Sequence, residues 1–196
     1  MKNIRSFSFV LSITIILMSL ILYTSQKHYW FYPATIGVWL FFDNLSHLVN
    51  NKTSIDLLIK KEYKKFLTLY LLLSIFGSLI ELFGNFLLGL WSYTYLSPIM
   101  VAISTLLFYP FILLSFKETF DAVKSRVKNF PISLVLSMLI GIIVWEIPNL
   151  YSNDWIYKMP FANITILQLN PIVIIGWSVL VLGPVFINKF NDKIHD

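Results

Sequence analysis

The sequence predicts an all-α, polytopic membrane protein with about six transmembrane helices. Of its 196 residues, 57% are hydrophobic and only 13% are charged, a balance that a soluble domain of this length rarely shows. The hydrophobic residues fall in long blocks separated by lysine-rich stretches, which is the pattern of membrane spans joined by loops. We therefore expect a single integral membrane domain over residues 1–196.

Six blocks come close to the ~20 residues that a helix needs to cross ~30 Å of hydrocarbon. The second block is the least apolar, because its end holds Asp43 and His47. The sixth is interrupted near its start by Gln168 and Asn170. The predicted spans are 7–24, 30–48, 66–89, 95–116, 130–150 and 165–187.

The first block has two possible interpretations, because Lys2 and Arg5 precede an apolar run from Phe7 to Tyr23. A secretory signal peptide begins in the same way. No small-x-small cleavage site follows the run, and the run is long enough to nearly span the membrane. We interpret it as a retained first helix.

The basic residues predict the orientation. All but Lys27 and Lys158 of the 15 Lys and Arg residues flank the chain ends or follow the second and fourth spans. Because cytoplasmic loops are enriched in Lys and Arg, both termini are expected in the cytoplasm, which requires an even number of spans. The formal net charge of +5 arises in these loops. The sequence contains no nucleic-acid-binding module, so we expect no nucleic acid partner. From the predicted spans we place the chain in a prokaryotic cytoplasmic membrane.

A polar and aromatic phrase occurs twice, with its tryptophans 64 residues apart. In both copies the spacing Asn-x5-Trp-x-Tyr follows a glutamate by about one helical turn. Intramembrane carboxyl groups are costly, so two in matching places indicate a paired functional site. The two copies consist of Glu81, Asn85, Trp91 and Tyr93, and of Glu146, Asn149, Trp155 and Tyr157.

The Trp-x-Tyr element occurs a third time at Trp30–Tyr32, which gives separations of 61 and 64 residues. Each copy follows an odd-numbered span on the predicted outer side. We interpret the pattern as three helical hairpins in parallel orientation. The alternative is an aromatic belt, because Trp and Tyr gather at membrane interfaces in any case.

Glu81 and Glu146 are predicted to lie at one depth in the outer half of the membrane. Each comes about 15 residues after the cytoplasmic start of its span, which is ~22 Å at 1.5 Å per residue. Two adjacent carboxyl groups share a proton, and a carboxylic acid held protonated is a competent general acid. The alternative is that each glutamate is neutral and joins helices through hydrogen bonds.

Asp43 is the third intramembrane acid, and it is expected nearer the cytoplasm than the glutamates. His47 lies one helical turn further on the same face. Together they could bind a divalent metal or relay a proton. We favour a polar network between helices and count Asp43 among the candidate binding residues.

The sequence lacks the motifs of several common catalytic and ligand-binding sites. The chain has no cysteine, which excludes disulfides, thiolate metal sites and cysteine nucleophiles. It has no Gly-rich phosphate loop, no Gly-x-Ser-x-Gly element and no His-Glu-x-x-His element. We therefore expect neither a metal nor a cofactor.

These phrases resemble a family of prokaryotic multi-pass membrane proteins that has no established activity. In that family an Asp-containing helix is followed by a Ser-Leu segment and then by a Phe-Glu-x-x-Asn…Trp-x-Tyr element. A Trp-Glu-x-x-Asn…Trp-x-Tyr-x-x-Pro element comes later in the chain. The resemblance covers about two-thirds of the chain and implies architecture and site residues, not chemistry. The pattern of a glutamate followed by Trp-x-Tyr is also similar to that of membrane carotenoid hydratases and cyclases. The matching positions are Phe31 to Asp43, Ser54, Leu57, Glu81 to Tyr93 (with one extra residue before Asn85) and Trp145 to Pro160.

The leading hypothesis is a pocket near the outer leaflet that binds or modifies a lipophilic, isoprenoid-like molecule. Glu81 and Glu146 would act as catalytic acids, the two asparagines would orient them, and the Trp and Tyr residues would close the rim. A small proton-coupled transporter is the first alternative. A non-enzymatic scaffold or partner subunit is the second. Whether the chain is an enzyme stays open, and its expected partners are membrane lipids, a lipophilic ligand and a membrane protein or second copy.

Overall fold

The computed structural model describes residues 2–50, 52–158 and 171–195, and in this part of the chain the fold is all-α apart from two three-residue strands. Pro160 and the predicted start of the sixth span lie outside the described residues. The elements are α1 (Lys2–Thr24), α2 (Phe31–His47), α3 (Ser54–Ile59), α4 (Tyr63–Glu81), the π-helix η1 (Leu82–Leu87), β1 (Trp91–Tyr93), α5 (Pro98–Leu107), α6 (Tyr109–Arg126), α7 (Phe130–Gly141), the π-helix η2 (Ile142–Glu146), α8 (Ile147–Ser152), β2 (Trp155–Tyr157) and α9 (Pro171–His195).

Four helical segments are long and apolar enough to cross a membrane: Asn3–Thr24, Tyr63–Leu87, Phe130–Ser152 and Val173–His195. A fifth candidate is the pair α5 and α6, which is bent by 44° at Phe108. The bend has a local cause, since Pro110 has no N–H to continue the helical ladder. The expected second span corresponds to α2, which has 17 residues and falls short of the usual length. Six spans therefore stay a prediction.

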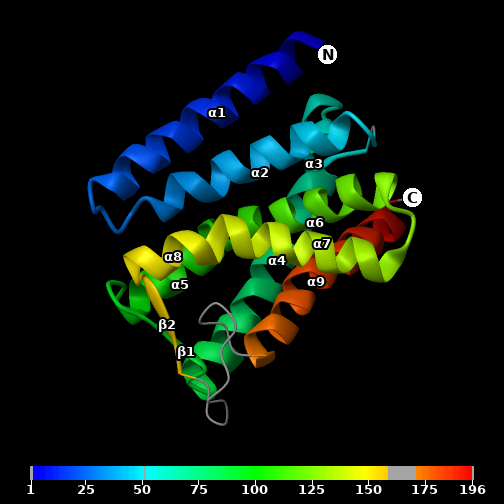
Figure 1. Cartoon of the computed structure of the whole chain (residues 1–196). Coiled ribbons are helices and arrows are strands. Elements are labelled where there is room, and N and C mark those ends of the chain that lie inside the picture. The colour runs from blue at the N-terminus through cyan, green and yellow to red at the C-terminus, as the bar shows by residue number, and fades with distance from the viewer. Residues whose placement is uncertain (1, 51, 159–170, 196) are drawn as a thin grey trace.

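The helices pack around α6, which contacts α2, α4, α5, α7 and α9 (Figure 1). Its buried face is apolar in the middle, where Ile112 and Phe116 join one core cluster and Leu113 joins another. The two labelled chain ends lie toward the same end of the molecule, on the right in Figure 1. A helix with this many neighbours places some of its polar residues inside the protein, and α6 buries Lys117 and Glu118 near its middle.

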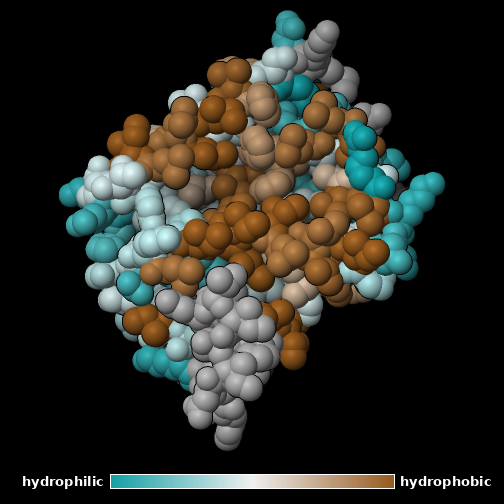
Figure 2. Space-filling view, in the orientation of Figure 1, coloured by the Kyte–Doolittle hydropathy of each residue, from teal (hydrophilic) through white to brown (hydrophobic). Residues whose placement is uncertain are grey.

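The outer surface of several helices is apolar. Phe7, Leu88 and Ile175 have 68%, 65% and 66% of their surface exposed. Figure 2 shows large hydrophobic areas over the helices, with hydrophilic residues collected toward opposite edges of the view. Contiguous apolar surface of this extent is typical of a protein that faces lipid.

The glutamates of both copies of the repeated pattern, Glu81 and Glu146, lie at a π-helical stretch. Glu81 is the last residue of α4 directly before η1, and Glu146 is the last residue of η2. A π-helical turn inserts an extra residue into the α-helical ladder, and such turns are frequent at functional sites. Here they separate the regular part of each helix from the segment that leads to the Trp-x-Tyr element.

The second and third Trp-x-Tyr elements form the two strands, which pair with each other. They run antiparallel in the register Trp91 to Tyr157, Ser92 to Ile156 and Tyr93 to Trp155. The first element differs, because Trp30 precedes α2 and its Phe31 and Tyr32 already belong to that helix. The two strands thus bring together segments that lie 64 residues apart in the sequence.

Candidate functional site

One cavity of about 460 Å³ contains both predicted catalytic glutamates. Its walls come from the end of α4, η1, β1, α6, η2, β2 and α9, with Phe31 of α2 at one side. Apart from the two carboxyl groups and the tyrosine hydroxyls, the lining is almost entirely apolar or aromatic. The predicted rim residues Trp91, Tyr93, Trp155 and Tyr157 all line it.

Glu81 accepts hydrogen bonds from three side chains of its own phrase. The Tyr93 hydroxyl donates to Oε1 at 2.7 Å, and Trp91 Nε1 donates to Oε2 at 3.3 Å. Asn85 Nδ2 also donates to Oε2 at 3.3 Å. The extra residue between Glu81 and Asn85 therefore leaves the amide within reach of the carboxyl group.

Glu146 has the matching contact, since the Tyr157 hydroxyl donates to its Oε1 in a short hydrogen bond. Asn149 holds the strand instead: its Nδ2 donates to the Trp155 carbonyl at 2.9 Å, and its Oδ1 accepts from the Trp155 N–H at 3.0 Å. Asn149 thus fixes the backbone that carries Tyr157, so the amide positions the donor to the carboxyl group.

The two carboxyl groups face one cavity without a direct bond between them in the described residues. Tyr109, at the start of α6, lines the cavity and lies close enough to interact electrostatically with both glutamates. Sequence reasoning missed Tyr109, and the available signal was its place directly before Pro110 in the middle of a predicted span. Trp145 and Trp177 also line the cavity and were missed.

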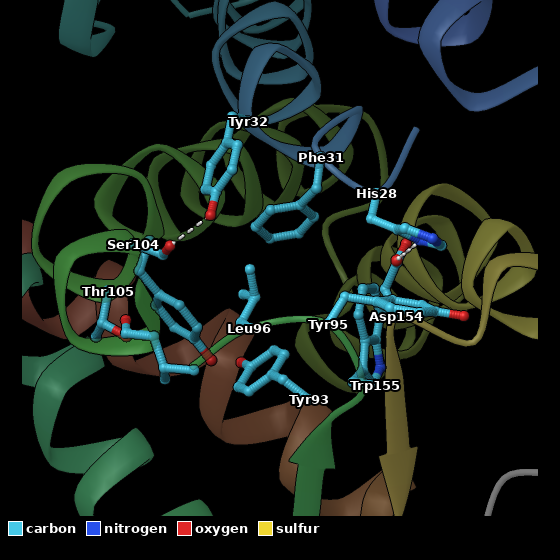
Figure 3. Close-up of a pocket in the computed structure, with 12 residues that line it drawn as sticks. His28, Phe31, Tyr32, Tyr93, Tyr95, Leu96, Ser104, Thr105, Asp154 and Trp155 are labelled. Atoms are coloured by element: carbon cyan, nitrogen blue, oxygen red, sulfur yellow. Dashed lines mark hydrogen bonds and ion pairs between the residues drawn. The ribbon is translucent and has the colours of Figure 1, made fainter. Parts of the chain in front are cut away.

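A second cavity of about 40 Å³ adjoins the first on the side of the interhelical loops and is large enough for water (Figure 3). Phe31, Tyr93, Tyr109 and Trp155 line both cavities.

At the edge of this small cavity, Asp154 accepts hydrogen bonds from Trp30 Nε1 at 2.6 Å and contacts His28 Nδ1 at 3.1 Å. The Tyr32 hydroxyl is within 2.9 Å of Ser104 Oγ (Figure 3). The Asp154 contacts tie the loop after α1 to the segment before β2, and the Tyr32 contact joins α2 to α5.

Gly84 lets the Trp91 ring lie against η1. A Cβ atom at Gly84 would come within 1.7 Å of Trp91 Cη2, so any side chain there displaces the indole. We expect Gly84→Ala to lower the free energy of unfolding by about 1–3 kcal/mol, the usual cost of overpacking. Denaturant unfolding in detergent measures it. Gly176→Ala is the matched control, because no described atom lies within 4 Å of its added Cβ, and a loss as large as that of Gly84→Ala would contradict the assignment.

The tyrosines that donate to the glutamates are held in the protonated form. Burial raises the pKa of Tyr93 and Tyr157 well above that of an ordinary phenol, and the neighbouring glutamates add to the rise. The folded-state pKa therefore exceeds the unfolded value of about 10. Because the folded state then binds more protons, its stability is complete below pH ~10 and declines above it.

We expect the free energy of unfolding to fall above pH ~10 by up to about 1.4 kcal/mol per pH unit for each of these tyrosines. Denaturant unfolding from neutral to alkaline pH measures the slope, and Tyr157→Phe should make it shallower. Tyr29→Phe is the control, since Tyr29 is 53% exposed. Equal slopes in the wild type and Tyr157→Phe would contradict this account.

Asp43 belongs to a different polar cluster and does not line the large cavity. Arg5 Nη1 donates to its Oδ1 at 2.5 Å, and Ser54 Oγ and the Ile55 N–H donate to its Oδ2 at 2.7 and 2.9 Å. Asp43 therefore joins α1 and α2 to the beginning of α3. This arrangement agrees with a polar network between helices.

The same cluster extends to α3 and α6. Arg5 Nη2 lies 2.5 Å from Asp56 Oδ1, and His47 Nδ1 lies 3.1 Å from Asp56 Oδ2. Burial raises the pKa of Asp56, but hydrogen bonds from Arg5 and the Thr53 N–H outweigh it and hold the pKa below its usual value. Within the described residues, no group of three His, Cys, Asp or Glu side chains could hold a metal ion.

On α6, the side chain of Glu118 accepts from the Ser54 N–H and from Lys117 Nζ, both at 2.9 Å. Both charged groups are buried. We refer to Arg5, Asp43, Asp56, Lys117 and Glu118 as the charged cluster. Only Asp43 of this cluster was predicted, because its members come from four separate helices.

Comparison with known proteins adds no assignment: no protein-family model, no curated protein and no solved structure matches the chain.

Proposed function

We propose that the chain binds a lipophilic molecule within the membrane, in the cavity that holds Glu81 and Glu146. The observation that carries the proposal is the cavity itself, an apolar space of about 460 Å³ with two carboxyl groups on its wall. Volumes of 300–1,000 Å³ with a few convergent polar groups are typical of ligand sites. The ligand has one polar or unsaturated group, which lies against the carboxyl pair.

The charge of the lining supports an acid role for the glutamates. No Lys, Arg or His is among the described residues that line the cavity. A carboxylate in an apolar interior is costly even where hydrogen bonds offset part of the cost, so a proton or a cationic ligand stabilises each glutamate further. A carboxyl group that carries its proton inside an apolar pocket is a general acid.

Protonation of an isoprenoid double bond is the reaction class that fits this site. The carboxyl O–H bond breaks, a C–H bond forms at one alkene carbon, and the other carbon becomes cationic. Loss of a proton from a neighbouring carbon to the resulting carboxylate restores the acid and moves the double bond. Aromatic faces stabilise positive charge, and Trp91, Trp155 and Tyr109 line the cavity at this place.

We extend the proposal to the architecture. Two repeats, Glu81–Tyr93 and Glu146–Tyr157, form the site, and six spans place both termini in the cytoplasm of a prokaryotic cell. The shared π-helices, the paired strands and the two tyrosine–glutamate hydrogen bonds support duplication. The bias of Lys and Arg supports the orientation.

Deuterium transfer tests the reaction. Purified protein in vesicles with a C15 or C20 isoprenoid alcohol is incubated in D₂O, and mass spectrometry measures carbon-bound deuterium. The wild type is expected to incorporate deuterium, and Glu146→Gln is expected to slow incorporation by about 10²–10⁴-fold, the usual contribution of a general acid. Glu62→Gln is the control, since Glu62 is an exposed acid near the start of α4. Equal rates in wild type and Glu146→Gln would overturn the acid role.

A proton-coupled carrier is the second candidate, and the absence of basic residues from the described lining favours it. A carboxyl group that releases its proton when a lipophilic cation binds would couple the transport of the cation to the transport of the proton. Vesicles with a pH gradient should then show saturable uptake of tetraphenylphosphonium, lost in Glu146→Gln. Uptake that does not respond to the gradient would eliminate this candidate.

A further inference from the structure

The cavity has an apolar opening where α4 and α9 separate. These helices pack together at Gly183, where a Cβ atom would come within 2.3 Å of the Phe76 ring. Gly176 lies seven residues earlier, and therefore on the same face of α9. There no described atom lies within 4 Å of an added Cβ, and the residue lines the cavity. The two helices thus touch at Gly183 and leave space at Gly176.

The edges of this opening are exposed and apolar. Phe83 and Leu88, on and just after η1, are 54% and 65% exposed, and Val179 of α9 is 48% exposed. All three also line the cavity. Because both helices are long and apolar enough to span a membrane, these side chains face acyl chains in a bilayer. We refer to Phe83, Leu88, Gly176 and Val179 as the side opening.

We infer that the ligand is a neutral, single-chain lipid that enters from the bilayer through the side opening. The inference rests on the proposed function and names its substrate class. The lining described has two carboxyl groups and no basic side chain, so an anionic headgroup such as phosphate meets repulsion and no partner. A volume of about 460 Å³ is in the usual range for one small ligand, which favours a single chain over the two chains of a diacyl lipid.

Fluorescence quenching measures binding without knowledge of the natural ligand. Trp91, Trp145, Trp155 and Trp177 line the cavity, out of six tryptophans in the chain. The wild type in phosphatidylcholine vesicles is titrated with a dibrominated C18 alcohol and with its phosphate monoester. The alcohol is expected to quench with saturation, and the ester only as much as a brominated phospholipid does. Equal saturable quenching by the ester would overturn the neutral class.

Blocking the side opening tests the route. Gly176→Leu is expected to weaken alcohol binding at least tenfold, whereas Ile175→Phe should leave it within twofold, because Ile175 is exposed and lies outside the described lining. The chain has no cysteine, so a second block is made after folding. Val179→Cys modified with N-cyclohexylmaleimide, which does not absorb tryptophan emission, should lose binding tenfold. Ile175→Cys modified in the same way should not, because Ile175 is exposed on α9 outside the lining.

Each outcome bears on a different claim. Saturable quenching that survives both blocks overturns the route and leaves the proposed function standing. No saturable quenching in the wild type overturns the proposed function together with the inference. Quenching that is lost in Gly176→Leu and in modified Val179→Cys, and kept in both controls, supports the route.

Discussion

Replacing Arg5 with methionine is expected to lower the free energy of unfolding by about 3–5 kcal/mol. The guanidinium is the partner that joins Asp43 and Asp56, and the three side chains are 10%, 0% and 2% exposed. Removing it leaves two buried carboxylates that keep their other hydrogen bonds but lose the guanidinium that offsets their charge. Denaturant unfolding of the detergent-solubilised protein measures the loss.

Lys60→Met is the control for this prediction, because Lys60 is exposed near the same loop. It should change the free energy of unfolding by no more than about 0.5 kcal/mol. The combination of Arg5→Met with Asp43→Asn should recover part of the loss, since one unpaired charge disappears. If Arg5→Met were as mild as Lys60→Met, the charged cluster would contribute no more than a surface ion pair.

Glu146→Gln and Glu146→Leu should separate a functional glutamate from a purely structural one. The amide oxygen of Gln still accepts from the Tyr157 hydroxyl, so the free energy of unfolding should stay within about 1 kcal/mol of the wild type. Leu leaves that hydroxyl without its acceptor and should cost about 1–3 kcal/mol. Both should lose deuterium transfer.

A structural role predicts a different pattern for the same pair. If Glu146 only joins helices, Glu146→Gln keeps every property of the wild type and Glu146→Leu loses stability alone. Asn149→Ala provides a comparison within the site, because it releases the Trp155 backbone without removing a carboxyl group. It should weaken the hydrogen bond between Tyr157 and Glu146 and lower the rate less than Glu146→Gln does.

The sequence predicted most of the helices because hydrophobic length is a strong signal. The long blocks around residues 7–24, 66–89 and 130–150 coincide with helices that can span a membrane. It predicted less well where a helix is short or broken, as in the 17-residue α2 and the bent pair α5 and α6. Such breaks depend on tertiary packing around Phe108 and Pro110, which a hydropathy pattern does not contain.

The sequence pointed to many residues of the candidate site, but it did not predict how strand pairing brings them together. The repeated glutamate and Trp-x-Tyr spacing identified residues that the structure brings to one cavity. Strand pairing between Trp91–Tyr93 and Trp155–Tyr157 was not expected, because three-residue strands have no detectable period. Tyr109 was missed because a lone tyrosine in a span has no distinguishing spacing.

The charged cluster shows a different limit. Arg5 and Asp43 are 38 residues apart and come from different helices. In the sequence, Arg5 looks like an ordinary basic residue before a first span. Only the packing of α1 on α2 brings the guanidinium to the carboxylate. A single sequence carries no signal for such a pair.

Mass spectrometry of the molecules that copurify with the gently solubilised protein distinguishes a ligand cavity from a purely structural site. The wild type is expected to retain a neutral, single-chain lipophilic molecule at about one per chain. A variant with both Glu81→Gln and Glu146→Gln, folded to the same extent, should lose it or hold it in altered form. Only bulk phospholipid, in equal amounts in both proteins, would contradict a ligand cavity and leave the glutamates as hydrogen-bonding contacts between helices.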